Sequence, residues 1–240
     1  MTATENEFRV MTSGAFTAAY LELIPQLERL TQAKVVTVTT SVGTGDISIL
    51  SRLKRGEIAD IVIIAEPLFR QFVADGLVLS EGHAVLARSV IAMAVRDGAP
   101  KPDISSADAL RKTLLAAKSI GYSASESGKY FTGELVQRLG IAGEVLGKSR
   151  LVGGGERVGA VVARGELELG FQQLSELLPV QGIAHITPLP PEFQKVTSII
   201  ASVAANSPDK ARARSAIAFL ASREAAQAIT MSGLEPMANR

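Results

Sequence analysis

The feature of this sequence that most constrains its fold is the run at residues 59–65, which is apolar except for Asp60. Such a run is typical of a strand with both faces buried, and strands of this kind belong to parallel sheets covered by helices. Strands and helices alternate around it in the order strand 8–11, helix 16–31, strand 34–40, helix to Arg55, strand 59–65 and helix 67–75. This alternation, with its short loops, predicts half of a doubly wound sheet.

The first predicted helix contains a proline. Phe16, Ala19 and Tyr20 begin an apolar stripe at helical spacing, which favours a helix over the whole range 16–31. Proline lacks an amide hydrogen and its ring clashes with the preceding turn, so we expect a kink or a break at Pro25.

The second half of the chain repeats the alternation. Its predicted elements are a strand at 85–95, a helix at 107–116, a strand from Ile120, a helix to about Leu139, a strand at 150–152, a helix at 156–164, a strand at 167–173, a short helix near 175–178, strands at 183–187 and 196–204, and helices at 209–221 and 223–232. The sequence therefore predicts an α/β protein with two similar α/β units.

Composition excludes several classes of function. The 25 basic residues are balanced by 24 acidic residues, so a net charge of +1 provides no basic surface for a nucleic acid or an anionic membrane. The chain has no cysteine, which excludes disulfides and thiolate chemistry. His83 and His185 lie far apart without the spacing of metal ligands, so we expect neither a metal site nor a cofactor.

The N-terminus bears on localisation. Residues 1–7 are polar and acidic, without the basic and apolar regions of a signal peptide. No run of 18 apolar residues suggests a membrane span. As written, the chain is expected in the cytoplasm. If Met1 replaces a removed signal sequence, the native protein is expected in the periplasm.

Residues 120–130 combine a short strand, a loop of small residues and the start of a helix. Ser127 is predicted as the N-cap, and Tyr130 stands where a capping box would have Glu or Gln. The amides of Gly128, Lys129 and Tyr130 would then be free at the positive end of the helix, which favours an anion. The accompanying charge and hydroxyls come from Lys129, Ser123, Ser125 and Ser127. The alternative is an ordinary capped helix.

Junctions of this kind recur. The strand–loop–helix junctions rich in Gly, Ser and Thr are 12–14, 40–45, 123–128 and 153–155. In an open α/β sheet they lie at the carboxyl ends of strands, where ligands bind. Arg157 and Arg88 could add counter-charges, because an arginine fork matches a carboxylate. Each junction alone is explained by tight helix packing, but four in two similar halves favour binding.

Better-known motifs are incomplete. Ser48 stands where a dinucleotide-binding fingerprint beginning at Gly43 needs its third glycine. Tyr130 follows Gly128-Lys129 where a phosphate-binding loop needs Ser or Thr. The sequence therefore predicts no nucleotide site.

Five segments carry a resemblance to a known family: Val10–Thr17, Leu53–Ile63, Ser127–Tyr130, Glu156–Ala160 and Leu169–Phe171. On these residues the chain resembles the type II periplasmic substrate-binding proteins, in the branch of the molybdate-binding proteins. The Gly-x-x-Ala-Asp at 56–60, followed by an apolar strand, is fairly specific for the fold. The resemblance implies two doubly wound α/β domains joined by two crossovers, residues 1–87 plus 197–240 and residues 88–196, which close on a ligand cleft between them.

The same resemblance implies a binding site. The molybdate binders hold their oxyanion with hydroxyls and amides at five places, which match Ser13, the Thr44-Gly45 loop, Ser127, Val158 and Gln173 by position. Together with neighbouring groups, the predicted ligand-binding residues are Ser13, Gly14, Thr44, Gly45, Arg88, Ser125, Ser127, Gly128, Lys129, Tyr130, Arg157, Val158 and Gln173.

Departures from the molybdate pattern favour a larger ligand. Gln173 stands where that family usually has Tyr, and Lys129 and Arg88 stand where it tends to have uncharged residues. Cations and an amide suit a ligand with several carboxylates. The same branch is similar to aconitate isomerase, which moves a proton across an allylic tricarboxylate and needs a base. Glu126, Glu156 and a neutralised Lys129 are the candidate bases, and the alternative for both glutamates is a solvated carboxylate near a helix start.

Three hypotheses remain open on the sequence. The first is a hinge-closing, monomeric binding protein for a small anion, of the molybdate ABC-transporter type, with an ABC permease as partner if it is exported. The second is an isomerase of a tricarboxylate, acting by allylic proton transfer on the same scaffold. The third is a non-catalytic cytoplasmic sensor. Whether the chain is an enzyme stays open at this point.

Overall fold

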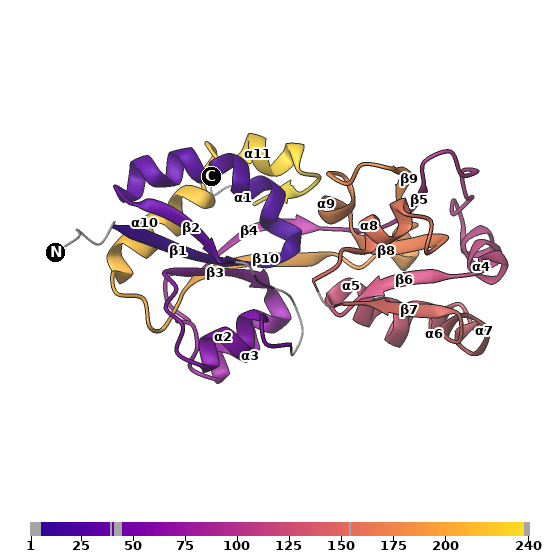
Figure 1. The fold of residues 1–240 in the computed structure, drawn as a ribbon, viewed down its shortest axis with the longest axis horizontal. Coiled ribbons are helices and arrows are strands. Elements are labelled where there is room, and N and C mark those ends of the chain that lie inside the picture. Colours follow the sequence, from indigo (N-terminus) through magenta and orange to yellow (C-terminus); the bar gives the residue numbers. More distant parts are fainter. Residues whose placement is uncertain (1–5, 39, 41–44, 154, 238–240) are drawn as a thin grey trace. The chain divides into compact units, whose positions relative to one another are not determined.

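The computed structural model describes residues 6–38, 40, 45–153 and 155–237. The chain divides into two compact units, the first made of Met1–Arg88 and Thr197–Arg240 and the second of Ser89–Val196. Arg88 falls in the first unit, whereas the predicted second domain began at this residue. Each unit is a β-sheet covered by helices, as Figure 1 shows.

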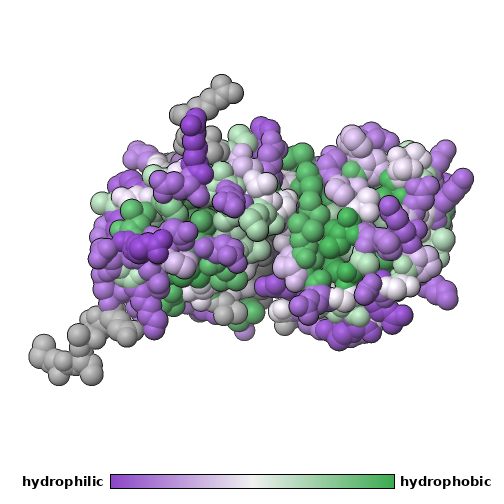
Figure 2. Space-filling model, turned by 90° about the horizontal axis from the view of Figure 1, so that it is seen from above, coloured by the Kyte–Doolittle hydropathy of each residue, from purple (hydrophilic) through white to green (hydrophobic). Residues whose placement is uncertain are grey.

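Polar side chains cover much of the surface. On the face shown in Figure 2, hydrophilic residues cover most of each unit, and hydrophobic residues form smaller areas on it. Separate clusters of buried apolar side chains fill the interior of each unit. Within the described residues, no helix is both long enough and apolar enough to cross a membrane.

Within the described part of the first unit, six strands form one mixed sheet in the order β11-β4-β10-β3-β1-β2. Their bounds are β1 Glu7–Thr12, β2 Lys34–Val38, β3 Ile61–Ala65, β4 Ala84–Ser89, β10 Thr197–Val203 and β11 Glu235–Pro236. β1 pairs in parallel with β2 and β3, whereas β10 runs antiparallel to β3. Residues 61–64 are all buried, as the apolar run predicted.

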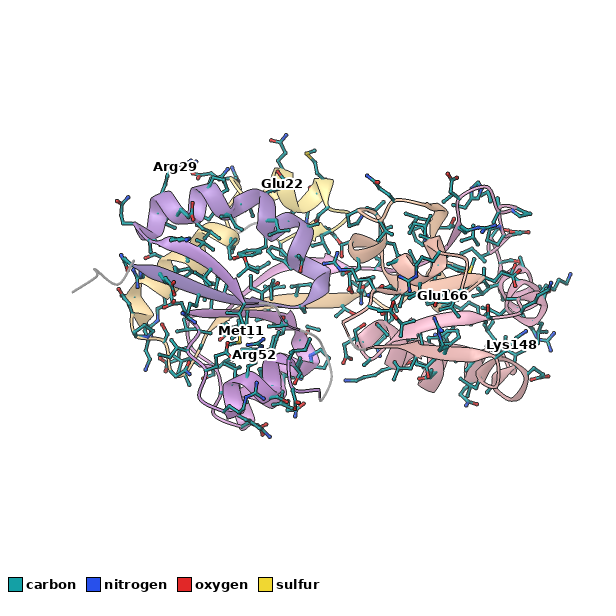
Figure 3. The ribbon with its side chains drawn as sticks, in the orientation of Figure 1. Met11, Glu22, Arg29, Arg52, Lys148 and Glu166 are labelled. Carbon is teal, nitrogen blue, oxygen red and sulfur yellow. The ribbon has the colours of Figure 1, made fainter. Side chains whose placement is uncertain are left out.

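Helices cover both faces of this sheet. One face carries α1 (Gly14–Thr31), α10 (Lys210–Leu220) and α11 (Ala226–Met231), and the other carries α2 (Ile49–Lys54) and α3 (Glu66–Ala74). Successive residues of a strand point to opposite faces. Val10 accordingly packs with α1, and Met11 packs on the side of α2 and α3 (Figure 3).

The break that Pro25 suggested does not occur. α1 continues as a single helix from Gly14 to Thr31 with Pro25 inside it. Leu23 and Leu27 lie on either side of the proline, and both are buried in the core. Tertiary packing of this apolar stripe therefore outweighs the missing backbone hydrogen bond.

The second unit is also built on one mixed sheet. In its described part, five strands lie in the order β7-β6-β8-β5-β9. Their bounds are β5 Ile91–Arg96, β6 Ile120–Ser123, β7 Ser149–Val152, β8 Leu169–Gln173 and β9 Ile183–Pro188. β6 is parallel to both β7 and β8, so these three strands end at the same edge of the sheet, where Figure 1 shows the arrowheads of β6 and β7. β5 runs antiparallel to β8.

The helices of the second unit differ in detail from those predicted. They are α4 Ala107–Ala116, α5 Glu126–Tyr130, a π-helical turn Phe131–Leu135, α6 Val136–Arg138, α7 Ala142–Leu146, α8 Val158–Ala163, α9 Leu174–Leu177 and a 3₁₀ turn Pro191–Phe193. α5, the π turn and α6 follow one another without a gap, which gives the helix predicted to Leu139. The sequence analysis missed α7 between α6 and β7.

The long strand predicted at 85–95 is wrong. Val90 separates β4 from β5, and the two strands belong to different sheets in different units. Most residues of both strands are apolar, and neither Gly nor Pro marks the break.

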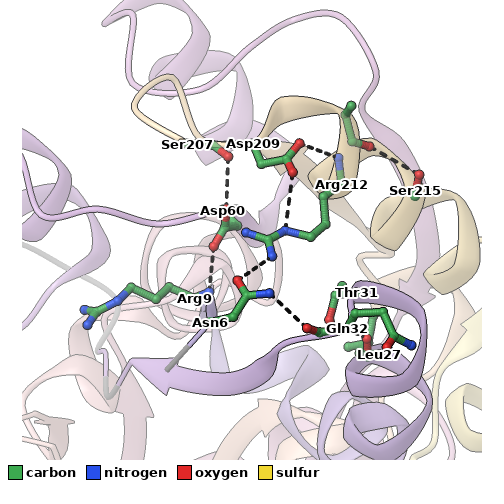
Figure 4. Close-up of polar contacts among 11 residues, drawn as sticks. Asn6, Arg9, Leu27, Thr31, Gln32, Asp60, Ser207, Asp209, Arg212 and Ser215 are labelled. Carbon is green, nitrogen blue, oxygen red and sulfur yellow. Dashed lines mark hydrogen bonds and ion pairs between the residues drawn. The ribbon is translucent and has the colours of Figure 1, made fainter. Parts of the chain in front are cut away.

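A buried aspartate ties the first unit together. Asp60 is 1% exposed, and its carboxylate accepts a hydrogen bond from the Arg9 amide at 2.7 Å and from the Ser207 hydroxyl at 3.1 Å (Figure 4). These bonds link β1 and the approach to β3 with the segment before α10. The aspartate of the Gly-x-x-Ala-Asp motif therefore has a structural role, because donors satisfy its buried charge.

Candidate functional site

Candidate binding groups of the second unit gather at the edge where β6, β7 and β8 end. Because the three strands are parallel, the segments that follow them begin at that same edge. Ser123 to Ser127 lie at the end of β6 and just after it, Arg157 follows β7, and Gln173 to Glu176 lie at the end of β8 and just after it. We call this edge the carboxyl edge.

Ser123, Ser125 and Ser127 form a chain of hydroxyls, which we call the serine cluster. The Oγ of Ser125 lies 2.7 Å from that of Ser123 and 3.0 Å from that of Ser127. Ser127 is fully buried, and the other two are half-buried. Each of the three hydroxyls has one hydrogen, and the two contacts use two of these three hydrogens. The third hydrogen has no acceptor among the described residues. The serine cluster can therefore donate to an anion.

Gly128 allows the loop of the serine cluster to fold back on itself. A Cβ placed at Gly128 would lie 1.7 Å from the carbonyl oxygen of Ser123, far inside the 3.0 Å limit that real Cβ atoms respect. Any side chain at this position would push apart the backbone that orders the serines. The glycine predicted at this site is thus required by close approach of the backbone.

The helix after the serine cluster begins earlier than predicted. Its N-cap is Ser125 and not Ser127, and α5 starts at Glu126. The amide of Lys129 donates to the carbonyl of Ser125 at 3.0 Å, so the prediction that this amide is free is wrong. Ser125 makes no side-chain cap. Its hydroxyl bonds to the neighbouring serines instead.

Two of the predicted site residues bind each other. Lys129 Nζ lies 2.7 Å from Glu126 Oε1, in an ion pair on the first turn of α5. The Lys129 side chain is 64% exposed and that of Glu126 is 16% exposed. Each charge is thus partly offset by the other.

The side chain of Tyr130 packs in the core of the second unit. The residue is 2% exposed, and its hydroxyl donates to the carbonyl of Phe193 at 2.7 Å. Burial of the ring raises the pKa of Tyr130 above its usual value. Lys195 Nζ lies 5.3 Å from the centre of the ring.

Gln173 ends β8 at the carboxyl edge and is 3% exposed. Its Oε1 accepts a hydrogen bond from the hydroxyl of Ser89 at 2.7 Å. Its Nε2 has no acceptor among the described residues, so Gln173 keeps amide hydrogens for a ligand. Ser89 therefore fixes the side chain of Gln173 in one orientation.

Arg157 is the N-cap of α8, and its side chain is exposed. It makes no ion pair with any residue that the structure describes. Val158, the first residue of α8, is fully buried. The carboxylate of Glu156 is instead held by Arg164 at 2.5 Å, an arginine at the far end of α8.

Glu176 was missed by the sequence analysis. It lies in the first turn of α9, and its Oε2 accepts a hydrogen bond from Gln172 Nε2 at 2.7 Å. Burial of the carboxyl raises the pKa of Glu176 to about 7, although the charge of Arg157 and the Gln172 hydrogen bond oppose the shift. The only signal in the sequence is a glutamate one helical turn beyond an amide, just after a strand.

The first unit offers a separate group. Ser13 follows β1 and is the N-cap of α1, but its side chain makes no capping bond. It is 7% exposed, and its Oγ is a buried polar atom without a hydrogen-bond partner among the described residues. A buried hydroxyl without a partner is costly, which favours a ligand there. Gly14 is the first residue of α1.

The remaining predicted residues belong to the first unit, and one of them lies outside the described residues. Gly45 is exposed three residues before Ser48, the N-cap of α2, and Thr44 lies outside the described residues. Arg88 is exposed on β4, opposite Glu235 of β11. Within the described residues, no cluster of three or more His, Asp or Glu could hold a metal ion.

Comparison with known proteins identifies the family. Residues 8–235 match the family described as Bacterial extracellular solute-binding protein. The chain belongs to this family. It is also 41% identical to an aconitate isomerase from a Pseudomonas species over 229 residues, which cover 95% of this chain and 87% of the relative.

Two solved structures of binding proteins share the fold of this chain. The periplasmic molybdate-binding protein of Azotobacter vinelandii is 17% identical with a TM-score of 0.73, over 95% of this chain and 98% of that protein. A sulfate-binding protein of Mycobacterium tuberculosis is 16% identical with a TM-score of 0.72, over 96% and 87%. The predicted α/β class and the resemblance to molybdate-binding type II periplasmic proteins are therefore confirmed.

Proposed function

We propose that this family member binds a small anion with several carboxylates at the carboxyl edge of the second unit. The observation that carries the proposal is the set of uncommitted donors there: a hydrogen of the serine cluster, Gln173 Nε2 and the guanidinium of Arg157. Hydroxyls and an amide suit any oxyanion, but a guanidinium fork matches a planar carboxylate. A polycarboxylate uses all three kinds of donor.

Ser13 in the first unit is a separate candidate for ligand binding. Its buried, unpartnered hydroxyl is the kind of group that a ligand oxygen would satisfy. The resemblance also predicts a cleft between the domains and hinge closure, and both stay predictions. The same holds for ligand binding by the remaining residues, which are Gly14, Thr44, Gly45, Arg88, Lys129 and Val158.

A second candidate function is isomerisation of aconitate. The observation that favours it is the relative named aconitate isomerase, which is 41% identical over 95% of this chain. The reaction needs a group that removes a proton beside donors that hold carboxylates. Glu176, with its pKa raised to about 7, supplies such a group at the carboxyl edge.

Transport is the alternative within the same family. In that case the native protein would be exported, would act as a monomer, and would deliver its ligand to an ABC permease. Interconversion of the ligand by the purified protein supports the isomerase. Tight binding without interconversion supports the transport receptor.

The first experiment is a thermal-shift screen of the purified chain with molybdate, tungstate, sulfate, phosphate, citrate, cis-aconitate and trans-aconitate. A ligand that binds only the native state raises the melting temperature by mass action. We expect a shift with the aconitates or citrate. A shift with molybdate or tungstate alone would overturn the polycarboxylate proposal. If the aconitates shift the melting temperature, proton NMR of those samples tests isomerisation.

Arg157→Ala tests the contribution of the guanidinium. If Arg157 holds a ligand carboxylate, we expect the variant to lose at least tenfold in affinity for the ligand found by the screen, or about 1.4 kcal/mol. Titration calorimetry measures this. Arg111→Ala is a matched control, because Arg111 is exposed on α4. Equal affinity of Arg157→Ala and the wild type would remove Arg157 from the site.

A further inference from the structure

The carboxylate of Glu176 differs from the other acidic groups near the carboxyl edge. Glu126 is held by Lys129 and Glu156 by Arg164, each in an ion pair. Glu176 has no ion pair among the described residues, and its hydrogen-bond donor is the neutral amide of Gln172 at 2.7 Å. It is therefore the one carboxylate of the three that is not bound to a cation.

The surroundings of Glu176 are mainly apolar. α9 packs on β5, β8, β9 and α8, and the next residue, Leu177, is buried in a cluster with Ala92 and Ala94. The charged and titratable residues of those elements are Arg96 on β5, His185 on β9, and Arg157 and Arg164 flanking α8. Arg164 is bound to Glu156 and Glu166, and Arg96 lies against Gly165 beyond the far end of α8. Arg157 is thus the cation that acts on Glu176.

The position of Glu176 points to proton transfer at the ligand site. α9 begins immediately after Gln173, so Glu176 lies one turn beyond an amide with free hydrogens and on the same edge as the serine cluster. Gln172, whose side chain is buried, holds the carboxylate in place. A fixed carboxylate beside anion donors is the arrangement that abstraction of a proton from a bound polycarboxylate requires.

We propose that Glu176 is the catalytic base that removes an allylic proton from bound aconitate and returns it to the other end of the allyl system. This inference rests on the proposed isomerase function. It assigns the proton transfer to a residue outside the earlier candidates Glu126, Lys129 and Glu156.

The step balances without a co-reactant. The methylene C–H bond of aconitate breaks, the proton goes to the Glu176 carboxylate, and the electron pair spreads over the three-carbon allyl unit. A new C–H bond then forms at the opposite carbon as Glu176 gives up its proton, and the double bond moves by one position. Arg157 and the donors of the serine cluster offset the negative charge that spreads onto the ligand carboxylates in between.

The raised pKa of Glu176 fits this role. A general base is most effective when its pKa is near the working pH, because it must both accept and release the proton. A carboxyl with a pKa of about 7 does both near neutrality, whereas a carboxylate with an ordinary pKa is a weaker base.

The test compares wild type and Glu176→Gln by proton NMR of cis- and trans-aconitate in D₂O, with titration calorimetry on the same samples. Glutamine keeps the shape and the hydrogen bond to Gln172 but cannot accept the proton. We expect turnover and deuterium uptake to fall at least 100-fold while affinity changes less than about threefold. Glu144→Gln is the control, because Glu144 is exposed on α7, before the amino end of β7, and should keep full turnover.

The outcomes separate this inference from the function on which it rests. Turnover in the wild type that persists in Glu176→Gln would overturn the role of Glu176 and leave the isomerase in place. Loss in Glu126→Gln or Glu156→Gln with retention in Glu176→Gln would move the base to that residue. A wild type that binds aconitate without interconversion or deuterium uptake would overturn the isomerase and this inference together. Loss of both binding and turnover in Glu176→Gln would show a structural role, and would also overturn it.

Discussion

Glu176 is a single residue whose burial has a consequence for stability. Its pKa is raised from the ordinary value of 4.5 to about 7, mainly because burial disfavours the charged carboxylate. Between pH 4.5 and pH 7 the folded protein therefore keeps a proton that the unfolded chain releases. The free energy of unfolding falls as the pH rises through this window and has lost this contribution fully above pH 7.

We expect Glu176→Gln to be more stable than the wild type at pH 8, by up to about 3 kcal/mol, and to differ little from it at pH 5. The physical reason is that glutamine has no charge to desolvate. Urea unfolding at the two pH values measures the difference. A stability difference that does not change with pH would contradict the raised pKa.

Residues of this kind are the hardest to find in a sequence. Ser127, Gly128, Arg157 and Gln173 were predicted from loops and from resemblance, and the structure places all four around the carboxyl edge. Glu176 belongs to no motif. The burial that raises its pKa depends on segments that are distant in the sequence. The hydroxyl bond from Ser89 to Gln173 likewise joins residues 84 positions apart. Such a contact leaves no local pattern in the sequence.

At the scale of elements, the loop from β6 to α5 depends on one glycine. We expect Gly128→Ala to lower the free energy of unfolding by about 1–3 kcal/mol, because the methyl group of the alanine would collide with the Ser123 carbonyl. We also expect weaker ligand binding, because the collision displaces the serine cluster. Urea unfolding and calorimetry measure the two effects.

Gly133→Ala provides the matched control five residues later. Gly133 lies in the π turn, and a Cβ there would meet nothing within 4 Å. Alanine at this position should be neutral or stabilising by up to about 1 kcal/mol, because it favours the helix. Equal stability of Gly128→Ala and Gly133→Ala would show that the loop tolerates a side chain.

Most elements could be predicted from periodicity, and the failures have physical causes. The buried strand β3 and the apolar stripe of α1 were visible because core packing imposes a pattern on sequence. The boundary between β4 and β5 could not be predicted from the apolar pattern, because the two strands follow each other directly and their patterns run together. The N-cap was misplaced from Ser125 to Ser127 because several serines compete for that position.

At the scale of the whole molecule, the resemblance predicts closure on a ligand. If the two units move as rigid bodies about the crossovers, the radius of gyration should fall when the ligand found by the screen is added. Small-angle X-ray scattering with and without this ligand measures the change. Arg157→Ala at the same ligand concentration serves as control if it has lost affinity. Identical curves for saturated and free wild type would count against closure.

The order of the strands also has a consequence for how the chain folds as it is made. The second unit, Ser89–Val196, is one continuous segment, so all of its strands leave the ribosome before the end of the first unit does. The first sheet is different, since β10 lies between β4 and β3 but is synthesised after the whole second unit. The second unit can therefore fold first during synthesis, while β4 stays separate from the group β3-β1-β2 until β10 is made. A chain truncated before Thr197 and released from the ribosome would therefore contain one complete unit and one open, aggregation-prone sheet.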